Sequence, residues 1–346
     1  MNPLPAVVGW DIGGVNTKVV RLLTAPYGPV MRSVCLPYEI KRDPGALVVT
    51  LLEAARRVGG GPGDLHAVTM TAELSQAFRT KREGVGVILD ALETAFSGSA
   101  LHIYSVSGSF LTPGEARELP RSVAAANWAA TAALVARSIP SCVLVDIGTT
   151  SADLIPIVEG RVVAQGRTDP ERLLSGELVY TGALRTPAEA VAHQVPLWGG
   201  TASVAADGFA LIGDAHLWLG RLQPEDYTCP TPDGAPPSRQ SAAERLARLV
   251  CGDREMLDDH AVDSIARALA QAQIHTLVGA MHTIQQRWPT IRWAVVTGLG
   301  DFIAVEAARD AGLEVIRLSD QLGDAARTAP AAAAAWLLRL GMELND

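Results

Sequence analysis

The chain has 346 residues, 48% of them hydrophobic and 19% charged, which is enough apolar material for one large domain or two smaller ones. A formal net charge of -8 argues against nucleic acid as the main partner, although backbone amides and a metal ion can still create a local anion site. The four cysteines are scattered without a Cys-x-x-Cys pair. Zinc and a disulfide framework are therefore not expected, and a reducing compartment is favoured.

Neither a targeting signal nor a membrane span is evident. The start, Met1 to Trp10, is apolar but lacks a basic region and reaches Asp11 too soon for a signal peptide. No run reaches the ~18 apolar residues that a bilayer requires, and the run 331–340 is too short. We expect a cytoplasmic protein with no membrane partner. The sequence leaves its oligomeric state open, a homo-oligomer included.

The first half alternates strand-like and helix-like segments. Apolar periodicity and turn residues predict strands at about 6–12 and 17–23, a helix at 44–58, a strand at 66–71, a helix at 84–96, a strand at 101–106, and an Ala-rich helix at 123–139. Pro140 ends that helix. Strand pairs followed by helices are typical of α/β architecture.

The second half starts with the same kind of strand pair. The pattern predicts strands at 142–147, 152–158 and 161–165, a helix at 207–219, a Pro-rich surface loop at 227–238, helices at 241–250 and 262–287, a strand at 293–297, a helix at 302–311, a strand at 313–316 and a last helix at about 330–340. We predict an N-terminal domain over 1–140, completed by a C-terminal helix at 330–341, and a C-terminal domain over 141–329.

One motif occurs twice. An apolar strand, the tripeptide Asp-Ile-Gly, small or hydroxyl residues and a second apolar strand occupy 7–18 and again 143–153. Asp146 follows Asp11 by 135 residues (146 − 11), a plausible length for a duplicated half. Each copy predicts a tight turn whose backbone N–H groups can approach an anion. Two such turns facing each other would hold a phosphate chain from both sides, whereas one alone is usually only a hairpin.

A third glycine-rich turn, Gly298-Leu299-Gly300-Asp301, lies between a predicted strand and a predicted helix. The N-terminus of a helix after such a turn is a common resting place for phosphate or a nucleotide. Most strand–helix turns contain glycine, so this turn alone is weak evidence for a ligand site. The presence of the paired motif strengthens that interpretation.

These three turns together resemble the phosphate and adenosine motifs of the actin, Hsp70 and sugar-kinase fold. Longer strings resemble its hydantoinase/oxoprolinase branch, and within it the tetrahydromethanopterin-linked C1-transfer proteins of methylofuran biosynthesis, which join an aminomethylfuran to tyramine-glutamate through an ether. The strings are Gly-Trp-Asp-Ile-Gly-Gly (9–14) with Asn16-Thr17-Lys18, Met-Thr-Ala-Glu-Leu (70–74) with 82–85, the second turn (146–153) with Ile155-Pro156-Ile157, Thr168-Asp169 with 171–173, and, most distinctive, 176–187.

The resemblance implies a fold of two duplicated α/β domains with a ligand cleft between them. It further implies a transferase in which a phenol oxygen attacks the methylene of a furan diphosphate, with Mg²⁺ assisting release of diphosphate. The alternative is an ATP-dependent kinase or a hydantoinase/oxoprolinase-type amidohydrolase that binds ATP or ADP in the same cleft. A non-catalytic ATP-bound scaffold is a weaker third.

One departure from the general hydantoinase pattern bears on this choice. Position 18 is lysine, where that pattern usually has an acid. Lysine favours a site built for anionic phosphate over metal-assisted amide hydrolysis. Asp214-x-His216 is the nearest approach to a dinuclear hydrolase signature, and in an apparently helical segment we interpret it as ordinary structure.

The catalytic residues predicted are Lys18, Glu73, Asp146 and Arg185. Lys18 would offset diphosphate charge, with a solvated strand lysine as the alternative. Glu73, just after a predicted strand, is the candidate base for a phenol of pKa near ~10, with a helix-start acid as the alternative. Arg185 would bind phosphate or a carboxylate, with a surface arginine as the alternative.

The remaining predicted site residues would bind phosphate, substrate or metal. Asp11 and Asp146 would hold Mg²⁺, mostly through water. Tyr180 would stack on an aromatic substrate or pack in the core, and Asp153 and Asp169 would bind substrate or cap turns. The full phosphate- and substrate-binding set is Asp11, Gly13, Gly14, Asn16, Thr17, Gly148, Thr149, Thr150, Ser151, Asp153, Asp169, Tyr180, Thr181, Gly298, Gly300 and Asp301.

Overall fold

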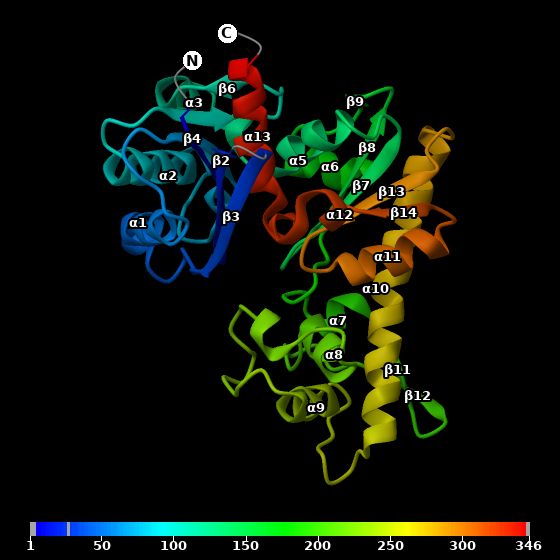
Figure 1. Ribbon diagram of the computed structural model, residues 1–346. Helices are drawn as coiled ribbons and strands as arrows, with labels where there is room; N and C mark the ends of the chain where they lie inside the picture. Colours follow the sequence, from blue (N-terminus) through cyan, green and yellow to red (C-terminus); the bar gives the residue numbers. More distant parts are fainter. Residues whose placement is uncertain (1–4, 26–27, 344–346) are drawn as a thin grey trace. The chain divides into compact units, whose positions relative to one another are not determined.

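A computed structural model describes residues 5–25 and 28–343, and these form two compact units (Figure 1). Unit 1 contains residues 1–142, 155–175 and 317–346, and unit 2 contains 143–154 and 176–316. The segment 1–10, for which no signal peptide is expected, lies partly outside the described residues. The two units differ from the two domains predicted from the sequence chiefly because residues 155–175 and 317–329 belong to unit 1. The predicted domain bounds stay a prediction.

Unit 1 is built on a six-stranded sheet with the order β3-β2-β1-β4-β5-β6. Its strands are β1 (Val7–Ile12), β2 (Asn16–Ala25), β3 (Gly28–Pro37), β4 (Leu65–Met70), β5 (Leu101–Tyr104) and β6 (Phe110–Leu111). Strands β1, β2 and β3 form an antiparallel meander, and β4 and β5 continue from β1 in parallel. The carboxyl ends of β1 and β4 therefore meet at one edge of the sheet, where open α/β sheets bind ligands.

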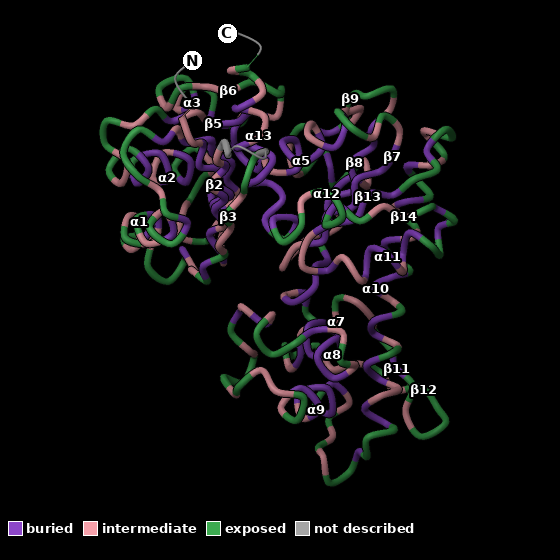
Figure 2. The backbone as a smooth tube through the Cα atoms, viewed as in Figure 1, coloured by how far each residue is buried: buried purple, intermediate pink, exposed green. Residues whose placement is uncertain are grey.

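Helices cover this sheet and bury its apolar side chains. The helices of unit 1 are α1 (Leu47–Arg57), α2 (Lys81–Ala95), α3 (Pro113–Glu118), α4 (Pro120–Val123), α5 (Asn127–Ala136), α6 (Asp169–Ser175), α12 (Ser319–Leu322) and α13 (Ala329–Glu343). The Ala-rich face of α13 packs on β1, β2, β4 and α5. Small side chains let this helix approach so closely that Gly9 in β1 has no room for a side chain. Figure 2 shows the buried strands beneath the helices.

The second sheet has the order β10-β8-β7-β13-β14, with β9 beside β8. Its strands are β7 (Cys142–Ile147), β8 (Ala152–Val158), β9 (Arg161–Val162), β10 (Leu178–Val179), β13 (Trp293–Thr297) and β14 (Glu314–Arg317). As in the first sheet, the strand before the turn is central and has a parallel neighbour, β13. Helix α11 (Asp301–Asp310) follows β13.

A helical region extends unit 2 beyond its sheet. It comprises α7 (Ala188–Val191), the hairpin β11 (Gln194–Leu197) with β12 (Gly200–Ser203), α8 (Ile212–Trp218), α9 (Arg239–Arg248) and the long helix α10 (Asp259–Arg287). Helix α10 contacts both α8 and α11, so it joins the helical region to the sheet. The loop predicted at 227–238 is present and is held by buried Arg245, which pairs with Asp214 and Asp233.

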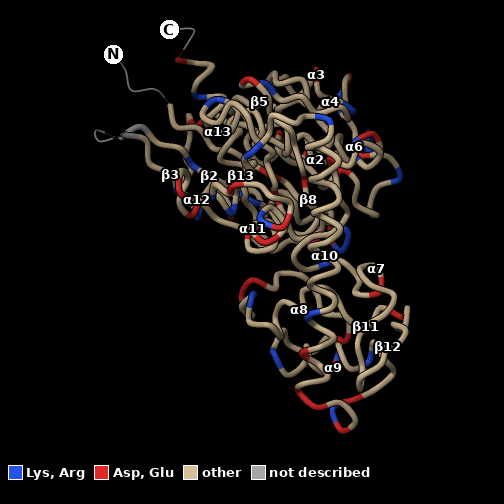
Figure 3. Tube along the Cα trace, turned by 90° about the vertical axis from the view of Figure 1, so that its right-hand side faces the viewer, with Lys and Arg blue, Asp and Glu red and all other residues tan. Residues whose placement is uncertain are grey.

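Some predicted elements need correction. The helix expected at 123–139 begins only at Asn127, because Ala125 adopts a left-handed φ of 50° that no helix accommodates. The helix expected at 207–219 begins at Ile212, since Leu211 forms a β-bridge with Pro187. The strand expected at 161–165 ends at Val162. Among the described helices, none is both long and apolar enough to cross a bilayer. Figure 3 shows that positions of Asp and Glu and positions of Lys and Arg are both scattered along the Cα trace.

Candidate functional site

The first turn joins β1 to β2 at the ligand edge of the unit 1 sheet. Its backbone closes through a hydrogen bond from Gly13 N to Asn16 O of 2.9 Å. The N–H groups of Gly14 and Val15 have no hydrogen-bond partner within the described chain, and both residues are only half-buried. Consecutive free N–H groups in a tight turn form an anion-binding concavity. The Thr17 hydroxyl is buried nearby and also has no hydrogen-bond partner among the described residues.

Asp11 and Lys18 face each other across this hairpin, as register partners in β1 and β2. Lys18 Nζ lies 3.2 Å from Asp11 Oδ2, while Oδ1 of Asp11 is buried and accepts no hydrogen bond from a described residue. Lys18 is therefore not a fully solvated strand lysine, since only 24% of its side chain is exposed. The pair leaves the turn close to neutral, so an anion meets the backbone donors without net repulsion.

The second turn repeats the first in unit 2. Gly148 N donates to Ser151 O at 2.9 Å, which is the same bond at the same 135-residue offset. The N–H groups of Thr150 and Ser151 have no hydrogen-bond partner within the described chain. Asp146 is the second-last residue of β7, just before the turn, and is 8% exposed. Both predicted turns thus have the local geometry expected of phosphate-binding elements.

The third glycine-rich turn packs directly on the second. Gly298 has a φ of 93°, and a Cβ there would lie 2.3 Å from Ile147 O and 2.5 Å from Asp146 Oδ1. Only glycine fits both the positive φ and this close approach. Gly300 N donates to Ile147 O at 2.9 Å, and Asp301 begins helix α11. The two turns of unit 2 therefore form one rigid assembly around Asp146.

A backbone strap, Thr181–Arg185, holds the second turn from its other side. Ala183 N donates to Gly148 O at 2.9 Å, and both Leu184 N and Arg185 N donate to Thr149 O. Arg185 is half-buried, and its guanidinium has no ion-pair or hydrogen-bond partner in the described part of the chain. A partly buried arginine attached to a phosphate turn without a carboxylate partner is well suited to bind an added anion.

The strap is in turn fixed by a buried hydrogen-bond network. Gln273 Nε2 on α10 donates to Thr181 Oγ1 at 2.9 Å and to Gly182 O at 2.8 Å. Because both amide protons are used there, Gln273 Oε1 must accept from His216 Nε2, 2.8 Å away. Burial lowers the pKa of His216 to about 4, so the ring is neutral. Neither Gln273 nor this role of Thr181 was predicted from the sequence.

Glu73 lies just beyond β4, in a short 3₁₀ helix, Ala72–Leu74. Thr71 N donates to Ile12 O at 2.9 Å, which ties this segment to the end of β1, immediately before the first turn. The Glu73 side chain is buried, with 1% of the residue exposed, and burial raises its pKa to about 7, partly offset by Lys81. A carboxyl group that titrates near neutral pH is suited to general-base catalysis.

The raised pKa of Glu73 predicts a stability effect. The folded protein binds a proton at Glu73 up to pH about 7, whereas an unfolded glutamate loses it near ~4.3. The stabilising contribution of Glu73 to the free energy of unfolding is therefore fully present below pH ~4.3. As pH rises from there to 7, that free energy falls by roughly 3 kcal/mol. His66 and His216, whose pKa values are lowered to about 4, have the opposite trend.

The difference between Glu73→Gln and the wild type isolates this contribution. We expect the free energies of unfolding to be most alike at about pH 4 or below, and the variant to become progressively more stable than the wild type as pH rises to 8, measured by denaturant unfolding. A constant difference between the two proteins across this range would contradict the assignment.

The structure places the other predicted residues as follows. Tyr180 is 60% exposed, so the core-packing alternative was wrong. Asp153 is buried in β8 and faces Leu178 of β10. Asp169 begins α6 and binds Lys81. Asp214 pairs with Arg245 and Tyr227, which gives it a structural role.

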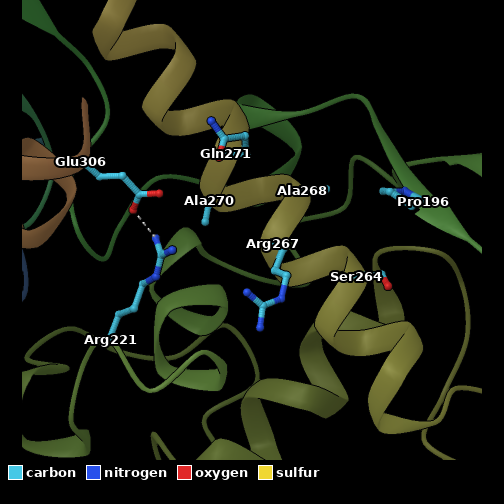
Figure 4. A pocket seen from close by; sticks show the side chains of 8 residues that line it. All are labelled: Pro196, Arg221, Ser264, Arg267, Ala268, Ala270, Gln271 and Glu306. Carbon is cyan, nitrogen blue, oxygen red and sulfur yellow. Dashed lines mark ion pairs between the residues drawn. The ribbon is translucent and has the colours of Figure 1, made fainter. Parts of the chain in front are cut away.

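A surface pocket of about 490 Å³ lies in unit 2, between α10, α11 and the hairpin (Figure 4). Arg221 pairs with Glu306 at its rim, with 3.1 Å between Nη1 and Oε2. None of the predicted site residues lines this pocket. Its lining consists of Pro196, Arg221, Ser264, Arg267, Ala268, Ala270, Gln271 and Glu306. The phosphate turns are therefore a separate feature from this pocket.

The donor set near the turns limits how a metal can bind. Within the described residues, no group of three or more His, Cys, Asp or Glu is placed to hold a metal ion. Mg²⁺ often binds through one or two carboxylates, several waters and substrate phosphates. Oδ1 of Asp11, which accepts no hydrogen bond from a described residue, could serve as such a ligand. Asp146 has the equivalent position in β7, as the second-last residue of the strand.

The chain resembles known proteins along most of its length. A family model described as Hydantoinase/oxoprolinase matches residues 64–339. The chain is 36% identical over 335 residues to (4-{4-[2-(gamma-L-glutamylamino)ethyl]phenoxymethyl}furan-2-yl)methanamine synthase of Methanocaldococcus jannaschii, covering 96% of this chain and 97% of that protein. A protein of the same name from Methanococcus vannielii is 30% identical over 212 residues, covering 59% and 95%.

A solved structure of acetone carboxylase, free of nucleotide, superposes with a TM-score of 0.62 at 12% identity, over 96% of this chain and 70% of that chain. At this identity the likeness bears on the fold alone. The α/β fold of the actin, Hsp70 and sugar-kinase type, expected from the paired turns, is confirmed.

Proposed function

The chain belongs to the hydantoinase/oxoprolinase family, and from this premise we propose that it is a transferase of methylofuran biosynthesis. It joins an aminomethylfuran methyl diphosphate to the phenol oxygen of a tyramine-glutamate acceptor and releases diphosphate. The observation that carries this proposal is the 36% identity, over 96% of the chain, to a synthase whose name describes such a phenoxymethylfuran amine.

The two turns support the diphosphate half of the reaction. Each turn offers backbone N–H groups without a partner in the described chain. Each also has a basic residue attached to it, Lys18 at the first turn and Arg185 at the second. Donors fixed in advance stabilise charge that grows on a leaving group. Mg²⁺, for which Asp11 and Asp146 are the predicted ligands, would add to this stabilisation. That both turns hold one phosphate chain stays a prediction.

Glu73 supports the phenol half. The phenol oxygen attacks the methylene carbon as the bond between that carbon and the diphosphate oxygen breaks, and the phenol proton passes to the Glu73 carboxylate. A phenol has a pKa near ~10 and is mostly protonated at neutral pH, so a base with a pKa of about 7 promotes the attack. The buried setting of Glu73 also keeps water away from the proton transfer.

The competing function is an ATP-dependent kinase or amidohydrolase on the same fold. The acetone carboxylase likeness supports the fold but not the activity. A kinase would place the nucleotide base near Gly298–Asp301, whereas in the transferase that region would be reduced or would hold the second substrate. Heat protection distinguishes them: furan diphosphate at about 100 times its Kd should stabilise the protein by ~2.7 kcal/mol. Protection by ATP alone would favour the kinase.

Lys18 gives a direct test of phosphate binding. Lys18→Ala should weaken the binding of inorganic diphosphate by roughly tenfold or more, because a charge-assisted hydrogen bond is lost and Asp11 is left with an uncompensated charge. Isothermal titration calorimetry measures this affinity. Lys41→Ala is the matched control, since it breaks another lysine–carboxylate pair of unit 1, the one between Lys41 and Glu39. Equal affinities for wild type and Lys18→Ala would exclude Lys18 from the phosphate site.

A further inference from the structure

The surroundings of Glu73 contain a lysine that the reaction described above does not use. Helix α2 packs so tightly on the Glu73 turn that a Cβ at Gly84 would lie 2.5 Å from Glu73 O. This contact brings the first residue of the helix, Lys81, beside the buried carboxyl. Lys81 Nζ lies 3.2 Å from Glu73 Oε1. The glycine therefore fixes the position of the base relative to its cation.

Lys81 is shared with a second carboxylate. Its Nζ lies 2.6 Å from Asp169 Oδ2 on α6, 88 residues further along the chain. Arg172, 1% exposed, lies 3.6 Å from the other oxygen of Asp169 and stacks over Trp128, 4.5 Å from the ring centroid. All these residues belong to unit 1. The charges alternate in space in the order Glu73, Lys81, Asp169 and Arg172.

We propose that Lys81 is a positioning residue that, together with Asp169, sets the proton affinity of the general base Glu73. Lys81 stabilises the ionised form of Glu73, and Asp169 limits that effect by drawing the ammonium toward itself at the shorter distance. This inference rests on the proposed function, because it assigns to Glu73 the role of the base.

The proposal is specific because the charges of Lys81 and Asp169 have opposite effects on the pKa of Glu73. Burial raises its pKa, the charge of Lys81 lowers it, and the charge of Asp169 raises it. The charged groups that face Glu73 come from two elements, Lys81 from α2 and Asp169 from α6, with Arg172 behind Asp169. Removal of Lys81 and removal of Asp169 should therefore shift the pKa of Glu73 in opposite directions. A purely structural role for either residue predicts no such opposition.

The test measures the pKa of Glu73 in the full-length wild type, Lys81→Met and Asp169→Asn. Infrared spectroscopy detects the protonated carboxyl band, which is assigned to Glu73 by its loss in Glu73→Gln. From a wild-type value of about 7, we expect an upward shift of about one unit or more in Lys81→Met and a downward shift of about one unit in Asp169→Asn. Lys41→Met and Asp90→Asn, which disrupt other ion pairs of unit 1, are the controls and should leave the value unchanged.

The acid limb of kcat/KM for ether formation should move in the same directions, because that limb reports the base of the free enzyme. Substrate ionisation is common to all variants and cancels in the comparison. Shifts of equal sign in the two variants, or no shift in either, would overturn the proposal even if the ether forms. Opposite pKa shifts without any ether would instead leave the charge arrangement intact and contradict the proposed function.

Discussion

Glu73→Gln is expected to lower kcat for ether formation by roughly a hundred- to ten-thousandfold, the usual loss when a general base is removed. Glutamine keeps the size of the side chain but accepts no proton. Because Glu73 is buried beneath α2 and tied to the end of β1, little else near the phosphate turn should change. Stopped assays of the ether product, with thermal unfolding to verify the fold, measure the effect.

The matched control is Glu118→Gln, an exposed glutamate of the same unit. It should retain full activity. If Glu73→Gln were as active as this control, the base would have to be sought elsewhere and the inference about Lys81 would also fail. Retention of diphosphate affinity in Glu73→Gln would separate a loss of chemistry from a loss of binding.

Asp146→Asn and Asp11→Asn should each lower activity by roughly a hundredfold or more, on the scale of losing one key electrostatic group. Each aspartate is the second-last residue of the strand that precedes its turn. The carboxylate of Asp146 lies so close to Gly298 that an added Cβ there would be 2.5 Å from Oδ1, so asparagine, which has the same shape, keeps the packing and removes the charge. The measurement is kcat over a range of Mg²⁺ concentrations. A metal role predicts that high Mg²⁺ restores part of the activity.

Asp207→Asn, at an exposed position of unit 2, is the control and should behave as the wild type. An Asp146→Asn variant with normal turnover and normal Mg²⁺ dependence would show that the second turn is only a hairpin. The same result for Asp11→Asn would show that the first turn is also only a hairpin.

The sequence predicted the sheet cores closely because their signals are local. Strands β7, β8 and β13 have the predicted bounds, since each is a run of apolar residues limited by turn residues. The repeated motif also predicted that both turns would share one geometry, and the Gly13–Asn16 and Gly148–Ser151 bonds bear this out. Glu73 was predicted from its place after a strand.

Other features had no readable local signal. Strand β3 was missed because this edge strand exposes much of its length and shows little apolar alternation. A run of alanines contains no residue that marks where a helix starts. The sequence around Ala125 therefore did not reveal the left-handed backbone conformation of this residue. The pairing of Lys81 with Asp169 and that of Gln273 with Thr181 were missed because the partners lie 88 and 92 residues apart in the sequence. Such pairs become visible only when the fold brings the segments together.

The most direct test of the account is one reaction followed by phosphorus NMR. The protein is incubated with Mg²⁺, the aminomethylfuran methyl diphosphate and a tyramine-glutamate acceptor, without ATP. The account predicts that diphosphate and the aryl ether appear in equal amounts, and that Glu73→Gln forms neither at a comparable rate. Product that forms only when ATP is added, with ADP released in step with turnover, would contradict it and establish the ATP-dependent alternative.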